Sequence, residues 1–99
     1  VTPLVSLEGT WQVVELAFSG GIECTTLVTG FGISSGSKGQ GMPHLAFDGD
    51  STTYWEATEA PVSTIWLGMH FRTPQDIKCA VLRQSDAAGV WASAVALER

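Results

Sequence analysis

The sequence predicts an all-β domain, an antiparallel β-sandwich, and three observations support this fold class. Residues 11–18 and 65–71 alternate between two faces with a period of two, which is typical of half-buried strands. Turn-forming residues separate such segments at intervals of roughly ten residues, as in sandwiches and barrels. Only 15% of the residues are charged. Few charges are therefore available for the solvated face of a helix, and we expect no amphipathic helix.

In the first half of the chain, the strongest strand is expected at residues 11–18 (WQVVELAF). Residues 23–29 are a weaker strand candidate. Residues 30–43 are rich in Gly and Ser and predict an irregular loop within one domain. In the first strand, one face would carry Gln12, Val14, Leu16 and Phe18, and the other Trp11, Val13, Glu15 and Ala17.

In the second half, Asp48-Gly49-Asp50-Ser51 is a predicted turn, in which Gly49 can adopt a positive φ. Extended structure resumes at residues 53–55. Residues 65–71 should form a strand, followed by a turn at 73–76 and strands at 77–84 and 91–97. In the strand at 65–71, Ile65, Leu67, Met69 and Phe71 should point inward and Trp66, Gly68 and His70 outward.

The composition excludes some classes of partner. A chain of 99 residues forms a single domain. Its net charge is −5, with two lysines and three arginines scattered along it, so the basic surface that a nucleic-acid-binding protein needs is missing. No apolar run approaches the ~20 residues of a membrane span, so no transmembrane segment is predicted.

Cys24 and Cys79 are the only cysteines, and their separation does not match a zinc motif. Two interpretations stay open: one disulfide, or two buried free thiols. A disulfide would indicate an oxidising compartment. We therefore expect an extracellular location or an organelle lumen.

Several segments resemble the discoidin domain, also called the coagulation-factor type C domain, of the galactose-binding-domain-like family. Residues 46–55 (AFDGDSTTYW), then residues 66–71 (WLGMHF), then Pro74 and Ile77, follow the order of the family pattern. The resemblance covers about residues 10–99, which leaves residues 1–9 as an N-terminal extension. It implies an eight-stranded jelly roll.

The chain departs from the family pattern at two places. His70 stands where the family usually has Asp or another polar residue. Family members also continue past the position of Arg99 with a hairpin and a closing strand. The resemblance therefore implies a jelly roll that lacks its C-terminal closing strands and has an unpaired sheet edge.

Carbohydrate-binding relatives hold a structural calcium at the acidic turn, and the matching residues here are Asp48, Asp50 and Thr53. Calcium takes six to eight oxygen ligands, which carboxylates, hydroxyls and backbone carbonyls supply. The alternative is a turn whose carboxylates accept backbone hydrogen bonds without a metal. Both interpretations stay open.

Candidate contact residues are Phe31 and Met42 in the Gly-rich loop, and Trp91 beside a predicted turn. By the resemblance, Trp55 and Trp66 would be core or near-core residues, and Trp11 would pack at the end of the sandwich. Relatives bind through loops at one end of the sandwich, with apolar tips for membranes or polar and aromatic groups for sugars.

We therefore expect a non-catalytic module that binds glycans or lipid headgroups through its end loops. His44 and His70 are the only histidines, and no nucleophile motif accompanies them, so no enzymatic activity is predicted. The alternative is an accessory or docking subunit that packs on a larger protein assembly, such as a membrane complex, through its loops or open edge.

Overall fold

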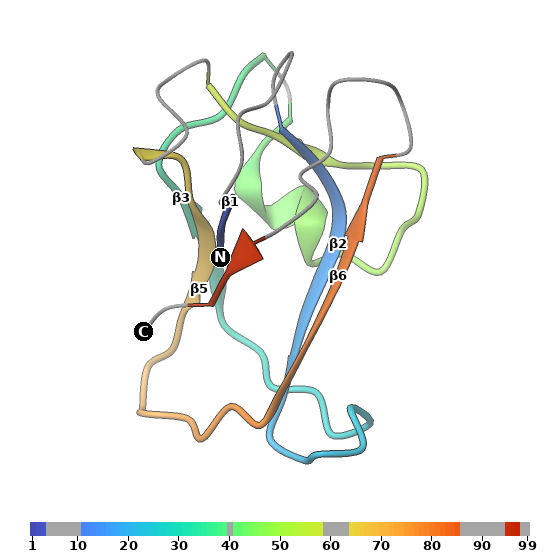
Figure 1. Ribbon diagram of the computed structural model, residues 1–99, viewed down its shortest axis with the longest axis vertical. Helices are drawn as coiled ribbons and strands as arrows, with labels where there is room; N and C mark the ends of the chain where they lie inside the picture. The colour runs from blue at the N-terminus through green and yellow to red at the C-terminus, as the bar shows by residue number, and fades with distance from the viewer. Residues whose placement is uncertain (4–10, 40, 59–63, 86–94, 98–99) are drawn as a thin grey trace.

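A computed structural model describes residues 1–3, 11–39, 41–58, 64–85 and 95–97. These residues are mostly strand, joined by one short 3-10 helix, which confirms the all-β class (Figure 1). The elements are β1 (Thr2–Pro3), β2 (Gln12–Ser19), β3 (Phe31–Ser34), η1 (Pro43–Ala46), β4 (Trp55–Glu56), β5 (Leu67–His70), β6 (Cys79–Gln84) and β7 (Val95–Ala96).

All strand pairs among the described residues are antiparallel. They form a three-stranded sheet of order β4-β2-β6 and two-stranded sheets β3-β5 and β1-β7. The Val1 nitrogen donates to the Leu67 carbonyl, and the Leu67 N–H donates back to the Val1 carbonyl at 2.9 Å, which joins β1 to β5. Residues 1–3 of the expected extension therefore pair with the domain. Figure 1 shows β3 and β5 on the opposite side of the molecule from β2 and β6, with η1 between them.

A register shift interrupts the alternation of β2. Val13 pairs with Gln84 but Glu15 with Arg83, so Val14 is an extra residue in the ladder with β6. Such a bulge reverses which side chains face inward. The prediction of two uniform faces was therefore wrong. The buried side chains are Trp11 and Val13 before the bulge, and Leu16 and Phe18 after it.

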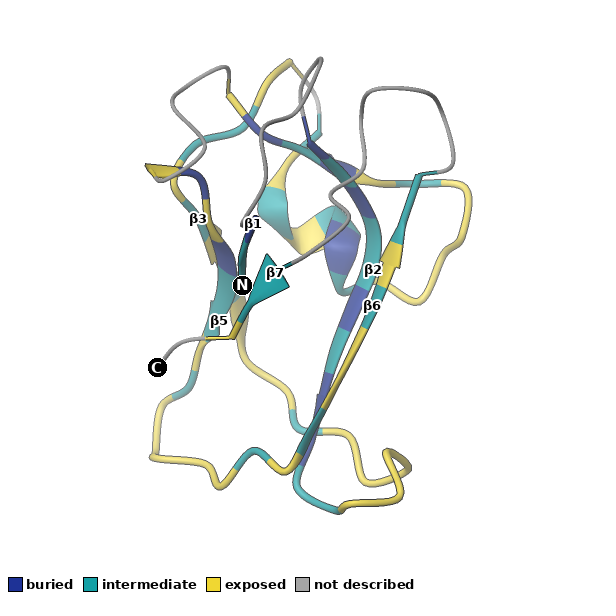
Figure 2. Ribbon diagram, viewed as in Figure 1, coloured by how far each residue is buried: buried dark blue, intermediate teal, exposed yellow. Residues whose placement is uncertain are grey.

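Two buried tryptophans occupy the centre of the core. The Trp11 and Trp55 rings meet edge to face with centroids 5.6 Å apart, and both side chains are fully buried. Each indole N–H has an acceptor: Gln84 Oε1 at 2.6 Å from Trp11, and Ser37 Oγ at 3.1 Å from Trp55. Trp55 is thus a core residue as expected, whereas Trp66 is 40% exposed. Figure 2 shows the buried residues along β2 and on the inner side of β5.

The weaker strand candidate at residues 23–29 does not form a strand. These residues are turns and bends with an isolated bridge from Leu27 to Ser19. The Ser19 hydroxyl accepts hydrogen bonds from the Gly21 and Thr26 amides, both at 3.2 Å, which folds the segment back on itself. A Cys24–Cys79 disulfide, with the Cα atoms 5.4 Å apart, fastens it to β6.

The disulfide closes a separation of 55 residues. In the chain-entropy model, a loop of that length stabilises the fold by about 4 kcal/mol. Of the two interpretations, the disulfide is therefore the correct one, and Cys24 and Cys79 are not free thiols.

The Gly-rich segment 30–43 is more regular than predicted, since it contains β3 and leads into η1. Its glycines permit close packing. A Cβ at Gly30 would lie 2.4 Å from the His70 carbonyl oxygen, and one at Gly32 would lie 2.9 Å from Phe47 Cδ2. Glycine is needed at these positions because β3 lies close to β5 and η1, and the glycines do not indicate an irregular loop.

The last two predicted strands are seen in part. The strand expected at 77–84 begins at Cys79, and Val95–Ala96 of the strand expected at 91–97 forms β7. Residues 91–94 lie outside the described residues. The inward positions predicted for Ile65 and Leu67 are confirmed, because both side chains are buried. The outward position predicted for His70 is confirmed by its exposure.

We predict that Gly30→Ala destabilises the fold by about 2–3 kcal/mol, because the new Cβ would overlap the backbone of β5. Gly68→Ala is the matched control in the paired strand. No atom lies within 4 Å of a Cβ built at Gly68, so alanine there should be neutral or stabilise by about 0.5–1 kcal/mol. Urea unfolding of both variants measures the difference. Equal stability of the two variants would contradict the close packing of β3 on β5.

Candidate functional site

The acidic turn follows η1 and is held by its own side chains. Gly49 has φ +72°, the left-handed conformation expected of it. Asp48 Oδ1 accepts from the Asp50 amide at 3.0 Å, and Asp50 Oδ1 accepts from the Thr52 amide at 2.8 Å and hydroxyl at 2.6 Å. The Thr53 hydroxyl lies 2.5 Å from Asp48 Oδ2. The predicted turn is confirmed, and hydrogen bonds account for its shape.

A residue of β2 attaches this turn to the sheet. Glu15 Oε1 accepts from the Gly49 amide at 2.8 Å. Partial burial raises the pKa of Glu15, the Gly49 hydrogen bond opposes that rise, and the nearby carboxylates of Asp48 and Asp50 add to it. The folded protein therefore resists ionisation of Glu15. Because of this, the free energy of unfolding falls as the pH rises from the ordinary pKa of a glutamate through the raised pKa of Glu15.

Asp50 shows the opposite behaviour. Hydrogen bonds from the Thr52 hydroxyl and amide lower the pKa of Asp50. Its contribution to stability is present above the ordinary pKa of an aspartate and is lost as the pH falls. The two carboxylates thus respond to acid in opposite directions, although Glu15 of β2 is bonded to the turn that contains Asp50.

The side-chain oxygens proposed as calcium ligands take part in the hydrogen bonds of the turn. Both oxygens of Asp48 and Oδ1 of Asp50 already accept hydrogen bonds within the turn. No group of three or more His, Cys, Asp or Glu side chains suited to a metal occurs among the described residues. A calcium ion at Asp48, Asp50 and Thr53 would therefore have to replace these hydrogen bonds and draw further oxygen ligands from the backbone.

Two of the three predicted contact residues, Phe31 and Met42, are among the described residues. Phe31 begins β3 and is 58% exposed, and Met42 precedes η1 and is 47% exposed. Trp91 lies outside the described residues. The exposure expected for Phe31 and Met42 is confirmed.

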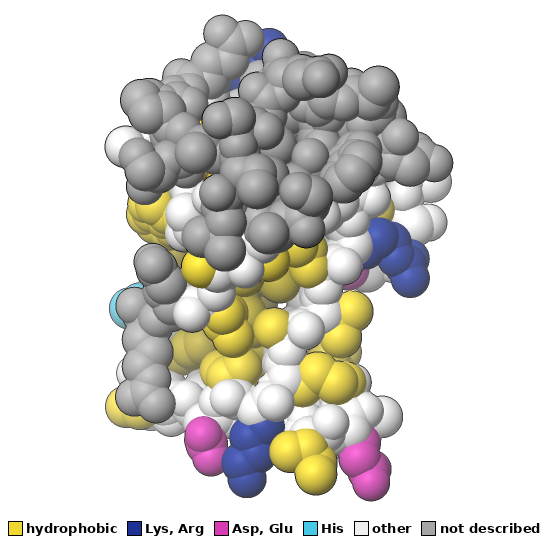
Figure 3. All heavy atoms as spheres, in the orientation of Figure 1, with side chains coloured by type: hydrophobic (Ala, Val, Ile, Leu, Met, Phe, Trp, Pro, Cys, Tyr) yellow, Lys and Arg dark blue, Asp and Glu magenta, His cyan; other side chains and the backbone are white. Residues whose placement is uncertain are grey.

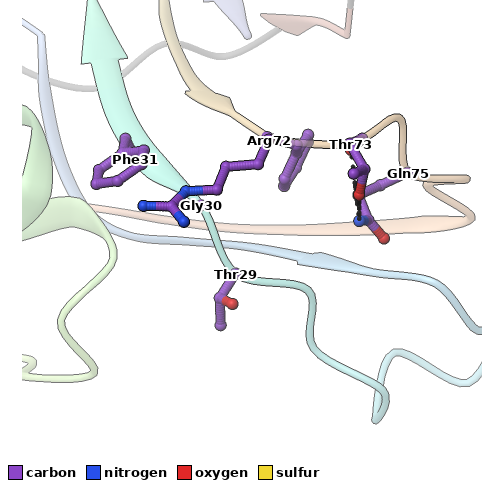
Figure 4. A pocket seen from close by; sticks show the side chains of 7 residues that line it. Thr29, Gly30, Phe31, Arg72, Thr73 and Gln75 are labelled. Carbon is purple, nitrogen blue, oxygen red and sulfur yellow. Dashed lines mark hydrogen bonds between the residues drawn. The ribbon is translucent and has the colours of Figure 1, made fainter.

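A pocket of about 400 Å³ opens beside Phe31, where β3 begins and β5 has ended (Figure 4). Its size is within the range of small-ligand sites. Figure 4 shows side chains from the two segments gathered around it. The lining residues are Thr29, Gly30, Phe31, Phe71, Arg72, Thr73 and Gln75.

Arg72 and Phe31 interact across the two segments that form the pocket. The Arg72 guanidinium carbon lies 5.9 Å from the centroid of the Phe31 ring, within cation–π distance. On the other side, Gln75 Nε2 lies 3.4 Å from the Thr73 carbonyl and 3.3 Å from its hydroxyl. The pocket therefore combines an aromatic ring, a cation and neutral polar groups.

Phe31 also begins an exposed stripe on the outer face of the β3-β5 sheet. Cross-strand partners share a face, and Phe31 pairs with His70 and Ile33 with Gly68. Ile33 is 40% exposed, and the space above Gly68 is open. Ser35, the next outward residue, bonds to the backbone of Trp66, which is also exposed.

Sequence reasoning identified Phe31 but missed its partners Arg72, Thr73 and Gln75. Thr73 and Gln75 fall in the predicted turn at 73–76, and Arg72 directly precedes it. The strand pairing of Phe31 with His70 is what brings them to Phe31, and one sequence does not specify that pairing. The sequence does contain one indication of this packing, the pattern Gly30-Phe31-Gly32. An aromatic residue between two glycines indicates that the backbone packs closely on both sides of an exposed ring.

We predict that Thr53→Val destabilises the domain by about 1 kcal/mol, because the hydroxyl beside Asp48 and the Asp50 carbonyl is lost. Thr25→Val, at an exposed position, is the control. Thermal unfolding with EDTA and with added calcium measures both variants. A loss that is equal in both conditions indicates a turn held by hydrogen bonds. A loss that occurs only with calcium would show instead that the hydroxyl is a metal ligand.

Searches of family models, curated proteins and solved structures found no match to this chain. Among the described residues, no helix is long and apolar enough to cross a membrane.

Proposed function

We propose that this chain is a non-catalytic binding module, with a discoidin-like β-sandwich, that recognises glycans or lipid headgroups through loops at one end. The pocket beside Phe31 is the observation that carries the proposal. It lies where the segment before β3 meets the segment after β5, as a site built from end loops requires.

The chemistry of the pocket suits binding. Phe31 and Phe71 offer apolar surface, and Thr29, Thr73 and Gln75 offer hydrogen-bonding groups of both kinds. Such a mixture of apolar surface and a few polar groups is characteristic of ligand sites. The lining residues include no His, Asp, Glu or Cys, the usual bases and nucleophiles of hydrolases, which favours binding over catalysis.

The remaining parts of the proposal concern location and metal. The Cys24–Cys79 disulfide is compatible with an oxidising compartment, and we propose an extracellular or lumenal location. A structural calcium at Asp48, Asp50 and Thr53 stays a separate proposal, which would require the turn to exchange hydrogen bonds for metal bonds. Ligand binding beside Phe31 does not depend on it.

The proposal predicts that Phe31→Ala weakens ligand binding about tenfold, because the main apolar surface of the pocket is removed. Leu27→Ala is the control, since Leu27 is 64% exposed but does not line the pocket. A glycan array and liposome flotation identify the ligand, and titration calorimetry measures both variants. Absence of binding to every glycan and lipid would contradict the proposal.

A docking or accessory role is the second candidate, and one observation favours it. In the part of the chain that the structure describes, β6 is at the edge of the β4-β2-β6 sheet, and Val81 is 49% exposed. Figure 3 shows hydrophobic side chains on the face between the β5 and β6 sides of the molecule. An edge strand with exposed apolar side chains can pair with a strand of another protein.

A docking role predicts that the isolated chain self-associates at high micromolar concentration, because the edge of β6 pairs with itself when no partner is present. Val81→Lys should raise the monomer fraction measured by sedimentation equilibrium. Ile22→Lys, in a loop position that is 81% exposed, should not. A wild-type chain that stays monomeric throughout would remove the main support for this role.

A further inference from the structure

The Arg72 guanidinium is the charged group of the pocket, and a neutral ligand does not balance its charge. Phe31 is its only recorded partner among the described residues, at 5.9 Å from the ring centroid, and no carboxylate of those residues lies within ion-pair distance of it. Stacking on a ring face leaves the N–H groups at the edge of the guanidinium plane to donate. Arg72 is therefore an exposed cation beside the Phe31 ring, and its hydrogen-bonding capacity stays available.

Resting on the proposed function, we propose that the pocket binds an acidic sugar, a uronic or sialic acid residue, with the sugar carboxylate paired to Arg72. A guanidinium and a carboxylate form a planar, bidentate pair with two parallel hydrogen bonds. Such pairs are among the strongest hydrogen-bonding arrangements in proteins. Figure 4 shows the Arg72 side chain extended across the pocket toward Phe31.

The neutral groups around Arg72 suit the rest of a sugar. Gln75 Nε2 is directed to Thr73, which leaves Gln75 Oε1 to accept from a sugar hydroxyl. The Thr29 hydroxyl, on the opposite wall, can donate or accept. Phe31 is still 58% exposed beside Arg72, so part of its ring is free to contact the apolar face of a pyranose.

The charge of the molecule favours a monoanion over a phosphate or an anionic membrane. The net charge is −5, and Arg72 is the single cation that lines the pocket. Asp76 follows Gln75 directly, is 83% exposed, and lies 3.8 Å from Lys78, so a carboxylate and an ammonium group nearly cancel there. One guanidinium balances one carboxylate, whereas a dianion or a charged bilayer would also meet the repulsion of the acidic surface.

The test measures binding of uronic-acid and sialic-acid oligosaccharides, their methyl esters and the matching neutral sugars to the full chain by titration calorimetry. The acids should bind about 10- to 100-fold more tightly than the esters, since a charge-assisted pair is lost on esterification. Arg72→Gln should abolish that preference. Arg83→Gln makes the same change in net charge on β6, away from the pocket, and should keep it.

The outcomes separate this inference from the proposed function. Equal affinity for acids and esters, an acid preference that survives Arg72→Gln, or binding only to vesicles that contain phosphatidylserine would overturn the acidic sugar and leave a binding module. An equal affinity for glutamate-rich peptides would overturn it too. Binding to no glycan or lipid would overturn both. Circular dichroism and the Tm of Arg72→Gln establish that this variant is folded. If Arg72→Lys restores part of the preference for the acid over the ester, the charge of Arg72 contributes to recognition.

Discussion

The bulge in β2 is the constraint on which most of this structure depends. β2 pairs with β4 at its start and with β6 along its length, and the shift between Val13 and Glu15 lets both halves of the strand bury large side chains. Without it, either the Trp11 end or the Phe18 end would face solvent. The same shift places Glu15 where its carboxylate reaches the Gly49 amide, so one backbone irregularity serves the core and anchors the acidic turn.

The pocket depends on a second packing constraint, the close approach of β3 to β5. Gly30 and Gly32 face the backbone of β5 and the Phe47 ring, and this fixes Phe31 on the outer face between them. Arg72 then reaches Phe31 because it follows β5, the strand paired with β3. The pocket is thus built from the start of a strand on one side and the segment that follows a strand on the other.

The acidic turn and the pocket illustrate how a conspicuous motif can differ from the candidate site. Asp48, Gly49 and Asp50 form the most recognisable pattern in the sequence, and their hydrogen bonds join β2 to the segment before β4. That role is structural. The groups suited to a ligand come from Thr29, Phe31, Arg72 and Gln75, and of these four residues the sequence alone indicates only Phe31.

Local patterns in the sequence were sufficient for the all-β class, the turn at Gly49 and the outward Trp66 and His70, and they marked Phe31 and Met42 as candidate contact residues. These features follow from alternation, turn chemistry and composition, which act over a few residues. Tertiary structure decided the bulge at Val14, the strand within the Gly-rich segment and the pairing of Cys24 with Cys79. It also decided the meeting of Phe31 with Arg72, because each of these depends on which distant strands pair and in which register, and that information is not local to any segment.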